Sequence, residues 1–338
     1  MSAQLWFAPA VASGLRSQGL VGKWASARLK IGDRHRPVRD DFAGYPVYRC
    51  WDVDRSFNTI LDQFVPDAVV VQSWIRTVAH CLERKIPVAY YVHAANEPID
   101  PESDAIRAAT LWMTVSRFSA RHNGATHGLR FEVVPPIVDP NGYRVANLAR
   151  RDVTLVGLQN FKGGERAIEL ARACPNISFL IFDNISSDMP GWPGMNGPEL
   201  RAAALALPNV RLRGPANTAG EIYGTTKILL APSRCLEAWG RVASEAQVNG
   251  IPVLASDRGG LPEAVGPGGV CLDYDAPVAE WVRHLRAMWD DAAYYAALSE
   301  RALAHSQRPD FQPSEILNRF AKSIEAHATA RSAAARTA

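Results

Sequence analysis

Two glutamates, Glu237 and Glu245, are the residues whose type and spacing are best suited to chemistry, with seven residues between them. Glu245 lies inside a helical pattern from Gly240 to Asn249, and Glu237 lies just before that pattern begins. This spacing brings both carboxylates toward one pocket at the amino end of the helix. Hydrogen-bond acceptors beside the positive end of a helix suit a ligand that carries hydroxyls and a phosphate.

The elements around these glutamates form a strand, loop, helix, strand unit within residues 229–273. The apolar run Ile228–Ala231 predicts a strand that stops at Pro232-Ser233. The helix ends at Gly250, and Ile251–Ala255 predicts the next strand.

A histidine in the first half of the chain occupies a position where such folds bind ligands. His93 directly follows the apolar run Pro87–Val92, and the carboxyl ends of parallel strands form the binding edge of an open α/β sheet. A structural histidine is the alternative, and the position favours function. Gly14 follows a predicted first strand at Gln4–Pro9, where a glycine lets a ligand approach the backbone, although an ordinary turn explains it equally well.

The remaining elements predict the fold class. Continuous apolar runs alternate with helical patterns, which is typical of parallel sheets covered on both faces. In the first half the further strands are expected at Pro46–Cys50, Asp67–Gln72, Thr110–Val115 and Arg130–Val134. In the second half they are expected at Val153–Gly157, Ile177–Phe182 and Asn209–Arg213. We therefore expect an α/β protein of two Rossmann-like, doubly wound parallel-sheet domains that face each other across a cleft.

The domain boundaries follow from breaks in this alternation. We expect an N-terminal domain at 1–145 and a C-terminal domain at 146–310. A helix at 311–328, with apolar residues at helical spacing, is expected to pack back toward the N-terminal domain. Residues 329–338 contain no large apolar residue and predict a flexible tail.

Composition excludes several classes of protein. A net charge of +3 in 338 residues does not indicate nucleic-acid binding, and no run approaches the ~18 apolar residues of a membrane span. The N-terminus has no basic residues before its apolar stretch, so we interpret it as a strand and not a signal peptide. The five cysteines form no CxxC pair, which favours a reducing, cytoplasmic location without a disulfide framework or a metal site.

The charge is unevenly distributed along the first quarter of the chain. Between Lys23 and Arg39, six basic residues face a single acidic one, Asp33. A solvated helix face and loop is the ordinary interpretation of such a run. Peripheral contact with the inner face of a membrane is the secondary hypothesis.

The segment 232–273 resembles the retaining nucleotide-sugar glycosyltransferases of the GT-B fold, the group 1 family. The resemblance is specific because several pieces occur in order: Pro232-Ser233, Glu237, Trp239-Gly240, Glu245-Ala246, Gly250-Ile251-Pro252-Val253, and Gly259-Gly260 with Glu263. Supporting pieces are Val156-Gly157 with Lys162-Gly163, Val115-Ser116 and His93. The similarity covers most of residues 87–290 and is strong only over 228–273.

The resemblance implies a transfer reaction in which negative charge grows on a departing nucleoside diphosphate. Such a site stabilises the diphosphate without a metal, by helix N-termini and basic side chains. Lys162 is then the candidate cation, and Gly157 belongs to the turn beside it. The amides of Ala238, Trp239 and Gly240 are the candidate donors.

The resemblance also assigns the carboxylates and the histidine. Glu245 would accept hydrogen bonds from the ribose hydroxyls, and Glu237 would hold hydroxyls of the donor sugar. His93 would bind the donor sugar or a reacting oxygen. For both glutamates the structural alternatives are a solvated helix face or an ion pair with Arg234 or Arg241.

The sequence departs from the family pattern at Leu158, where the family commonly has an arginine that pairs with the lysine on the diphosphate. Arg234, Arg241 and Arg258 lie in the motif region, and any of them is a candidate substitute. The double-glycine loop after the first strand is reduced to Gly14. These departures put the phosphate contacts and the acceptor side in question.

The resemblance therefore predicts a retaining, metal-independent transfer of a sugar to a hydroxyl of a glycan, lipid-linked or small-molecule acceptor, in polysaccharide or glycoconjugate biosynthesis. No cofactor is expected, because the nucleotide sugar is a substrate, and a UDP- or GDP-sugar is favoured. The alternative is a non-catalytic protein of this fold that binds nucleotide or a partner subunit. A nucleotide-sugar epimerase explains the motif less well.

Overall fold

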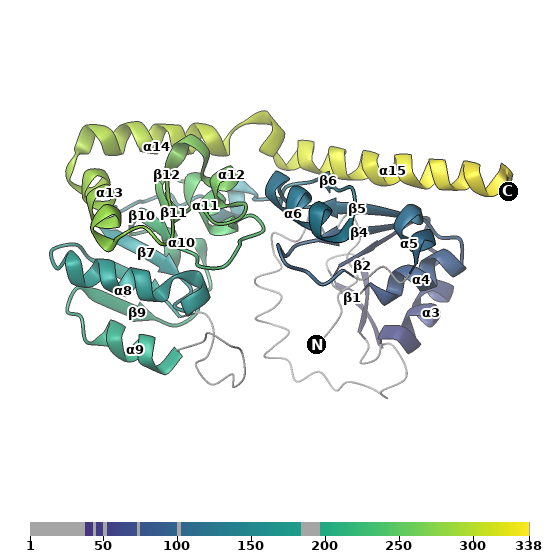
Figure 1. The fold of residues 1–338 in the computed structure, drawn as a ribbon, viewed down its shortest axis with the longest axis horizontal. Coiled ribbons are helices and arrows are strands. Elements are labelled where there is room, and N and C mark those ends of the chain that lie inside the picture. Colours follow the sequence, from purple (N-terminus) through teal and green to yellow (C-terminus); the bar gives the residue numbers. More distant parts are fainter. Residues whose placement is uncertain are drawn as a thin grey trace. The chain divides into compact units, whose positions relative to one another are not determined.

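The chain folds into two compact units. The computed structural model describes residues 38–42, 45–49, 53–72, 75–99, 103–183 and 197–337. The first unit contains the described residues up to Ile137 together with those from Pro313 onward, and the second unit spans Val138–Gln312. Figure 1 shows both units. The predicted strand Gln4–Pro9, Gly14 and most of the basic window lie outside the described residues.

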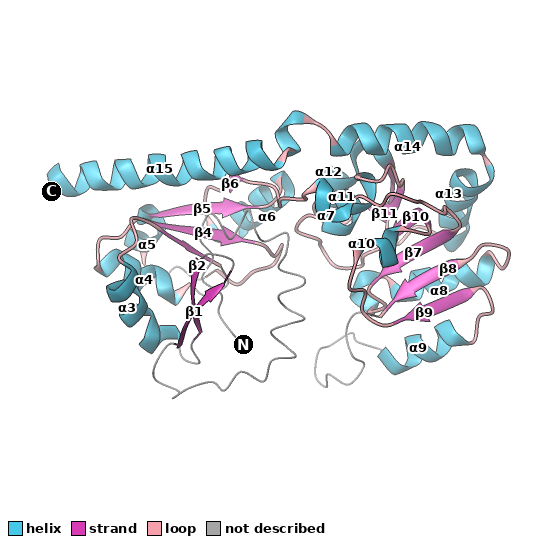
Figure 2. Ribbon diagram, turned by 180° about the vertical axis from the view of Figure 1, so that it is seen from behind, coloured by secondary structure: helices cyan, strands magenta, loops and turns pink. Residues whose placement is uncertain are grey.

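The second unit is built on a six-stranded sheet in the order β12-β11-β10-β7-β8-β9, and all of its pairs are parallel. Its strands are β7 (Asp152–Val156), β8 (Phe179–Phe182), β9 (Val210–Arg213), β10 (Thr226–Ala231), β11 (Val253–Ser256) and β12 (Gly269–Leu272). The chain winds outward from β7 in one direction and from β10 in the other (Figure 2). Such reversal of strand order defines a doubly wound fold.

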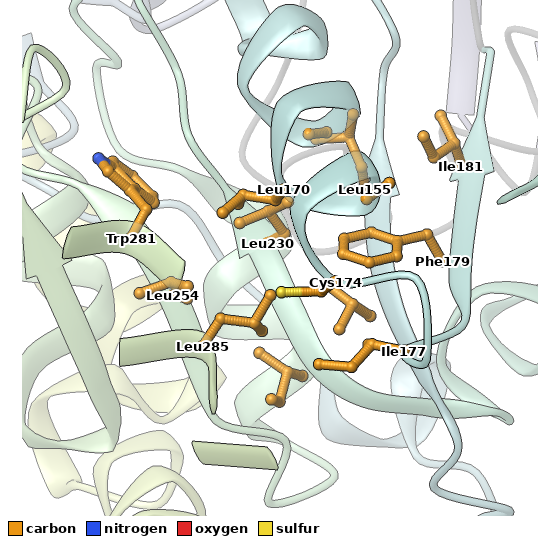
Figure 3. Close-up of a cluster of buried hydrophobic side chains, with 14 of the residues drawn as sticks. Leu155, Leu170, Cys174, Ile177, Phe179, Ile181, Leu230, Leu254, Trp281 and Leu285 are labelled. Atoms are coloured by element: carbon orange, nitrogen blue, oxygen red, sulfur yellow. The ribbon is translucent and has the colours of Figure 1, made fainter. Parts of the chain in front are cut away.

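Helices connect the strands of the second unit, as parallel pairing requires. The connecting helices are α8 (Gly164–Ala173), α9 (Gly197–Leu205), α10 (Ala219–Tyr223), α11 (Arg241–Gln247) and α12 (Leu261–Val265). The unit also contains α7 (Pro140–Tyr143) before β7, and α13 (Val278–Asp290) and α14 (Ala292–Ser306) after β12. Figure 3 shows the core, in which Leu170 and Cys174 at α8 lie among Leu155, Phe179 and Trp281. These apolar side chains come from the strands and from two helices. Their packing fixes the positions of the strand ends that carry the loops described below.

The first unit has a smaller parallel sheet of four strands in the order β3-β4-β5-β6. The strands are β3 (Val69–Val71), β4 (Val88–Val92), β5 (Thr110–Thr114) and β6 (Glu132–Val133). Its connecting helices are α4 (Arg76–Glu83), α5 (Asp104–Ala109) and α6 (Arg117–His127). The expected fold class, with a parallel-sheet unit in each half of the chain, is confirmed.

One strand of the first unit pairs differently from the expectation. The segment expected at Pro46–Cys50 forms β2 (Tyr45–Arg49), which pairs antiparallel with β1 (Val38–Phe42) instead of joining the parallel sheet. Only antiparallel strands can be joined by so short a connection. The sequence analysis also missed α3 (Val53–Phe64), which follows this hairpin.

The chain ends in a long helix, α15 (Pro313–Thr337), that belongs to the first unit. Phe320 and Ile316 are each 1% exposed, and the Phe320 ring lies 5.9 Å from that of Tyr91 in β4. The helix continues through Thr337, into the segment 329–338 for which a flexible tail was predicted. This segment is rich in alanine, the residue with the highest helix propensity. In the part of the chain that the structure describes, no helix has the length and apolar character to cross a membrane.

Candidate functional site

The order of strands in the second unit selects one edge of the sheet for ligand binding. Strands β7 and β10 are neighbours from which the chain winds in opposite directions. In open α/β sheets a ligand binds outside the carboxyl ends of two such strands. The loop after β7 carries Lys162, and the loop after β10 carries Glu237. The topology therefore brings these two predicted residues to the same place.

Lys162 and Glu237 are in direct contact. The Lys162 Nζ lies 2.6 Å from Glu237 Oε1, and the Ser233 hydroxyl donates to the same oxygen at 2.6 Å. The other carboxylate oxygen, Oε2, has no hydrogen-bond partner among the described side chains. The side chains remain 35% and 16% exposed for Lys162 and Glu237. The pair therefore presents a cation and a carboxylate oxygen that a ligand can reach.

The two loops are fastened together by backbone contacts. The N–H groups of Arg234 and Cys235 donate to the carbonyl of Phe161, at 2.9 and 3.1 Å. Gly163 has φ +83°, and a Cβ there would lie 1.9 Å from the carbonyl oxygen of Pro232. Only glycine can make this approach. Backbone contacts between the two loops therefore hold Lys162 next to Glu237, in addition to the contact between the side chains.

A third loop closes on Glu237 from the β11 side. Glu237 forms an isolated parallel bridge with Gly259, and the N–H of Gly260 donates to the Glu237 carbonyl at 2.7 Å. A Cβ on Gly259, at φ +70°, would lie 2.2 Å from that carbonyl oxygen. The Gly259-Gly260 pair of the motif therefore holds the backbone of Glu237. On the other side, Gly157, at φ +100°, lies against the Lys162 side chain, whose Cγ is 3.4 Å from a built Cβ.

The amino end of α11 adjoins Glu237. Gly240 precedes the helix at φ +98°, and a Cβ there would lie 2.5 Å from Leu261 Cδ2. Within the described residues, the amides of Trp239 and Gly240 donate to no backbone carbonyl. The Trp239 side chain is 4% exposed and stacks on Phe311 at 5.1 Å. Its indole is therefore structural, whereas the role of the Ala238, Trp239 and Gly240 amides as donors stays a prediction.

Glu245 lies in a different environment from Glu237. It is 3% exposed, and its Oε2 accepts from the Tyr223 hydroxyl at 2.8 Å. Its Oε1 lies 3.4 Å from the Arg241 Nε, and Arg241 also donates to the Tyr143 hydroxyl at 2.9 Å. Burial raises the pKa of Glu245, and these partners oppose the rise. The expected ion pair with Arg241 is present, and ribose binding by Glu245 stays a prediction.

The structure distinguishes the three arginines expected to replace a cation at Leu158. Arg241 pairs with Glu245, and Arg258 pairs with Asp275 at 2.7 Å. Arg234 is exposed, and it forms no ion pair with a described residue. Leu158 itself is 2% exposed in the core. Among the three, Arg234 is therefore the one whose charge is open to a ligand beside Lys162.

His93 lies in the first unit, directly after β4 as expected. Its side chain is exposed, and its ring centroid lies 4.1 Å from that of Tyr91. Ser116, at the end of the next strand, caps α6 by accepting from the N–H of Ser119 at 2.9 Å. These residues confirm that His93 is at the carboxyl edge of a parallel sheet. Its role toward a sugar stays a prediction.

Three site residues had not been assigned a role from the sequence. Ser233 lay inside a recognised motif without one, and its hydroxyl proved to share an oxygen of Glu237 with Lys162. Tyr223 and Tyr143 are separated from Glu245 along the chain, and no local pattern marks them. A serine between a strand-ending proline and the first glutamate was a usable signal, whereas the tyrosines required the tertiary structure.

Known proteins resemble this chain in the region that contains the site. Residues 155–305 match the family model described as "Glycosyl transferases group 1". The matched region contains the loops after β7 and β10, α11 and the loop after β11. It includes Lys162, Glu237 and Glu245.

Two relatives among curated proteins carry the same name. The D-inositol 3-phosphate glycosyltransferase of Corynebacterium glutamicum is 36% identical over 222 residues, which are 62% of this chain and 49% of the relative. The protein of the same name from Salinispora tropica is 30% identical over 231 residues, 59% of this chain and 48% of the relative. The chain thus spans about half the length of each of these relatives.

Solved structures share the fold at low sequence identity. A glycosyltransferase from Rickettsia africae has a TM-score of 0.69 and 15% identity, with 80% of this chain and 79% of that chain covered. HepE of Anabaena, crystallised with UDP, has a TM-score of 0.67 and 19% identity, with 80% and 81% covered. The likeness extends across both units, and at these identities it concerns the fold.

Proposed function

We propose that the protein is a glycosyltransferase that moves a sugar from a nucleotide-sugar donor to a hydroxyl of an acceptor, and the match of residues 155–305 to the family model described as "Glycosyl transferases group 1" supports this proposal. The observation that carries the proposal is the contact between Lys162 and Glu237 at the point where the strand order reverses. A lysine held there can oppose the charge of a diphosphate, and the open oxygen of Glu237 can accept from a sugar hydroxyl.

The proposed roles follow the residues. Lys162 stabilises the negative charge that grows on the departing diphosphate, and Arg234 supplies the second cation absent at Leu158. Glu237 orients the donor sugar, and Glu245 accepts from the ribose. His93 contacts the sugar or a reacting oxygen from the first unit, which also binds the acceptor.

We propose that the transfer retains the anomeric configuration and needs no metal ion. In a same-face displacement the departing phosphate oxygen takes the proton of the acceptor hydroxyl while the new glycosidic bond forms. No side chain then has to act as the base. The protein contributes orientation and charge stabilisation. NMR assignment of the product anomer tests the retention of configuration. Undiminished turnover in the presence of EDTA is the result expected if no metal ion is needed.

A ligand screen identifies the donor. UDP, GDP, ADP and TDP are titrated by calorimetry, and the sugar series of the one that binds is then assayed for transfer. HepE crystallised with UDP supports UDP as the first choice. The name of the relatives makes D-inositol 3-phosphate the first acceptor to assay, followed by glycan and lipid-linked hydroxyls.

Substitutions at the central pair test the site. We expect Lys162→Ala to lower kcat/KM by about 100- to 1000-fold, the typical loss when one donor to a developing anion is removed. We expect Glu237→Ala to lower it by about 100-fold. Lys322→Ala, at an exposed position of α15, is the matched control. Full activity in both site variants would overturn the assignment of the site.

The alternative is a non-catalytic protein of this fold, and the buried Leu158 is the observation that favours it. This alternative predicts that a nucleoside diphosphate binds without transfer or slow hydrolysis of any donor. The substitution Arg234→Ala distinguishes a role of this residue in transfer from a role in binding. If Arg234 replaces the missing cation, its removal lowers kcat by about tenfold or more and changes the binding of an uncharged acceptor little.

A further inference from the structure

Tyr143 is a buried tyrosine whose backbone carbonyl and side-chain hydroxyl both form hydrogen bonds with residues in or just after α11. It ends α7, is 7% exposed, and its backbone carbonyl accepts from Asn249 Nδ2 at 2.9 Å. Asn249 Oδ1 also accepts from the N–H of Val145 at 2.8 Å. The short segment around Tyr143 is therefore held against the carboxyl end of α11.

The hydroxyl of Tyr143 lies between a cation and a carboxylate. It accepts from the Arg241 guanidinium at 2.9 Å, because arginine can only donate. Arg241 in turn lies 3.4 Å from the Glu245 carboxylate. The Tyr143 hydroxyl also lowers the pKa of Glu245, so it faces that carboxylate. Arg241 thus contacts both Tyr143 and Glu245 and links the two.

We infer that Tyr143 is a positioning residue for the donor, which sets the orientation of the Glu245 carboxylate toward the ribose of a nucleoside diphosphate. This inference rests on the proposed function, because it takes Glu245 as the group that accepts from the ribose. A carboxylate offers about four acceptor directions. Tyr223 and Arg241 contact it directly, and Tyr143 holds the Arg241 guanidinium in place, so the direction left for a ligand is fixed.

The groups that face Glu245 come from three elements. Arg241 is on α11, Tyr223 on α10 and Tyr143 on α7. Burial raises the pKa of Glu245, and the Tyr143 hydroxyl is one of the groups that lower it. Removing that hydroxyl therefore raises the pKa further. Because the ionised carboxylate is the better acceptor, the loss of ribose binding on acidification then begins at a higher pH.

The test compares Tyr143→Phe with a matched control, Tyr295→Phe. Tyr295 also accepts from an arginine, Arg150, at 2.6 Å and donates to an oxygen, the Lys227 carbonyl, at 3.0 Å. Both substitutions therefore remove a hydroxyl that bridges an arginine and an acceptor. UDP, with GDP in parallel, is titrated into the wild type and both variants between pH 5 and 8. Thermal unfolding measures how much each variant is destabilised.

We expect Tyr143→Phe to weaken UDP binding by about tenfold, the effect of one hydrogen bond to a charged group. The fall in affinity on acidification should begin at a higher pH than in the wild type. Tyr295→Phe should lower the unfolding temperature by a similar amount and change neither binding property. The 2′-deoxy and 3′-deoxy forms of UDP locate the effect. The penalty of Tyr143→Phe should shrink below about threefold for the analogue that lacks the hydroxyl bound by Glu245.

The outcomes separate the two proposals. Wild-type protein that binds none of UDP, GDP, ADP and TDP overturns the proposed function and this inference with it. Wild-type binding that Tyr143→Phe leaves unchanged overturns the inference alone. The same tenfold penalty for UDP and for both deoxy analogues also overturns it, because Tyr143 would then act elsewhere than at the ribose.

Discussion

The two glutamates of one motif occupy opposite kinds of environment. Glu237 lies in a loop, is partly exposed, and uses one carboxylate oxygen for both Lys162 and Ser233. Glu245 lies in a helix, is 3% exposed, and is restrained through both oxygens. Glu237 therefore keeps an open oxygen for a ligand, whereas Glu245 is held in one orientation before any ligand arrives.

This difference teaches how one site can combine access with preorganisation. A group that contacts the reacting sugar needs an open face, and its lysine partner must also reach the diphosphate. A group that recognises an unreactive ribose gains from rigidity, because less entropy is lost on binding. We therefore expect changes at Glu237 to affect the rate and changes around Glu245 to affect binding.

The largest expected contrast comes from replacing each glutamate with glutamine. We expect Glu237→Gln to lower kcat by about 100-fold or more, because Lys162 loses its charged partner and the sugar loses a strong acceptor. Glu245→Gln should raise the donor KM about tenfold with little change in kcat. Steady-state kinetics with the donor found in the screen measure both. Equal effects on kcat would contradict the division of roles.

A smaller effect is expected where the backbone brings the two loops together. In Gly163→Ala the new methyl group would meet the Pro232 carbonyl at 1.9 Å, at a residue with φ +83°. We expect a loss of about 3 kcal/mol in the free energy of unfolding, together with a loss of activity. Urea titration measures the first and the transfer assay the second.

Gly128 provides the control for backbone strain alone. It ends α6 at φ +66°, and nothing lies within 4 Å of a Cβ built there. Gly128→Ala should therefore cost only about 1 kcal/mol. If both alanine variants lose the same stability, the close approach of the two loops is not what requires Gly163.

Much of the fold was predictable because its physical signal is local. Continuous apolar runs such as Val88–Val92 and Ile228–Ala231 can only be buried on both faces, which indicates parallel strands. The resemblance predicted that Lys162 and Glu237 serve one site, whereas their direct contact was not predicted. Ser233 lay within the same motif, but its hydrogen bond depends on a rotamer that no sequence pattern specifies.

Other features depend on contacts between distant residues. The hairpin of β1 and β2 was missed because its first strand, Val38–Phe42, is polar and charged and gives no apolar run. Glu245 looked like an accessible helix residue. Its burial depends on Tyr143 and Tyr223, which reach it from other elements. One tyrosine among many carries no periodic signal, so the sequence could not mark either of them.

The smallest expected effect is a pH dependence of stability that belongs to Glu245. Burial raises its pKa above the ordinary value of 4.5, so the folded protein binds this proton more tightly than the unfolded chain does. The contribution to stability is complete below pH 4.5 and is lost as the pH rises through the folded pKa. A tenfold difference in proton affinity between the folded and unfolded states corresponds to about 1.4 kcal/mol.

The Glu245→Gln variant lacks this titration. The free energy of unfolding of the wild type minus that of the variant should therefore decline as the pH rises above 4.5. Urea titrations at pH 4, 5, 6 and 7 measure this difference, and Glu300→Gln, at an exposed position of α14, is the control. A difference that grows with pH would mean that Tyr223, Tyr143 and Arg241 stabilise the ionised carboxylate by more than burial opposes it. Glu245 would then be, like Glu237, an ionised carboxylate that the folded protein accommodates. The two glutamates would then differ only in the exposed fraction of their side chains.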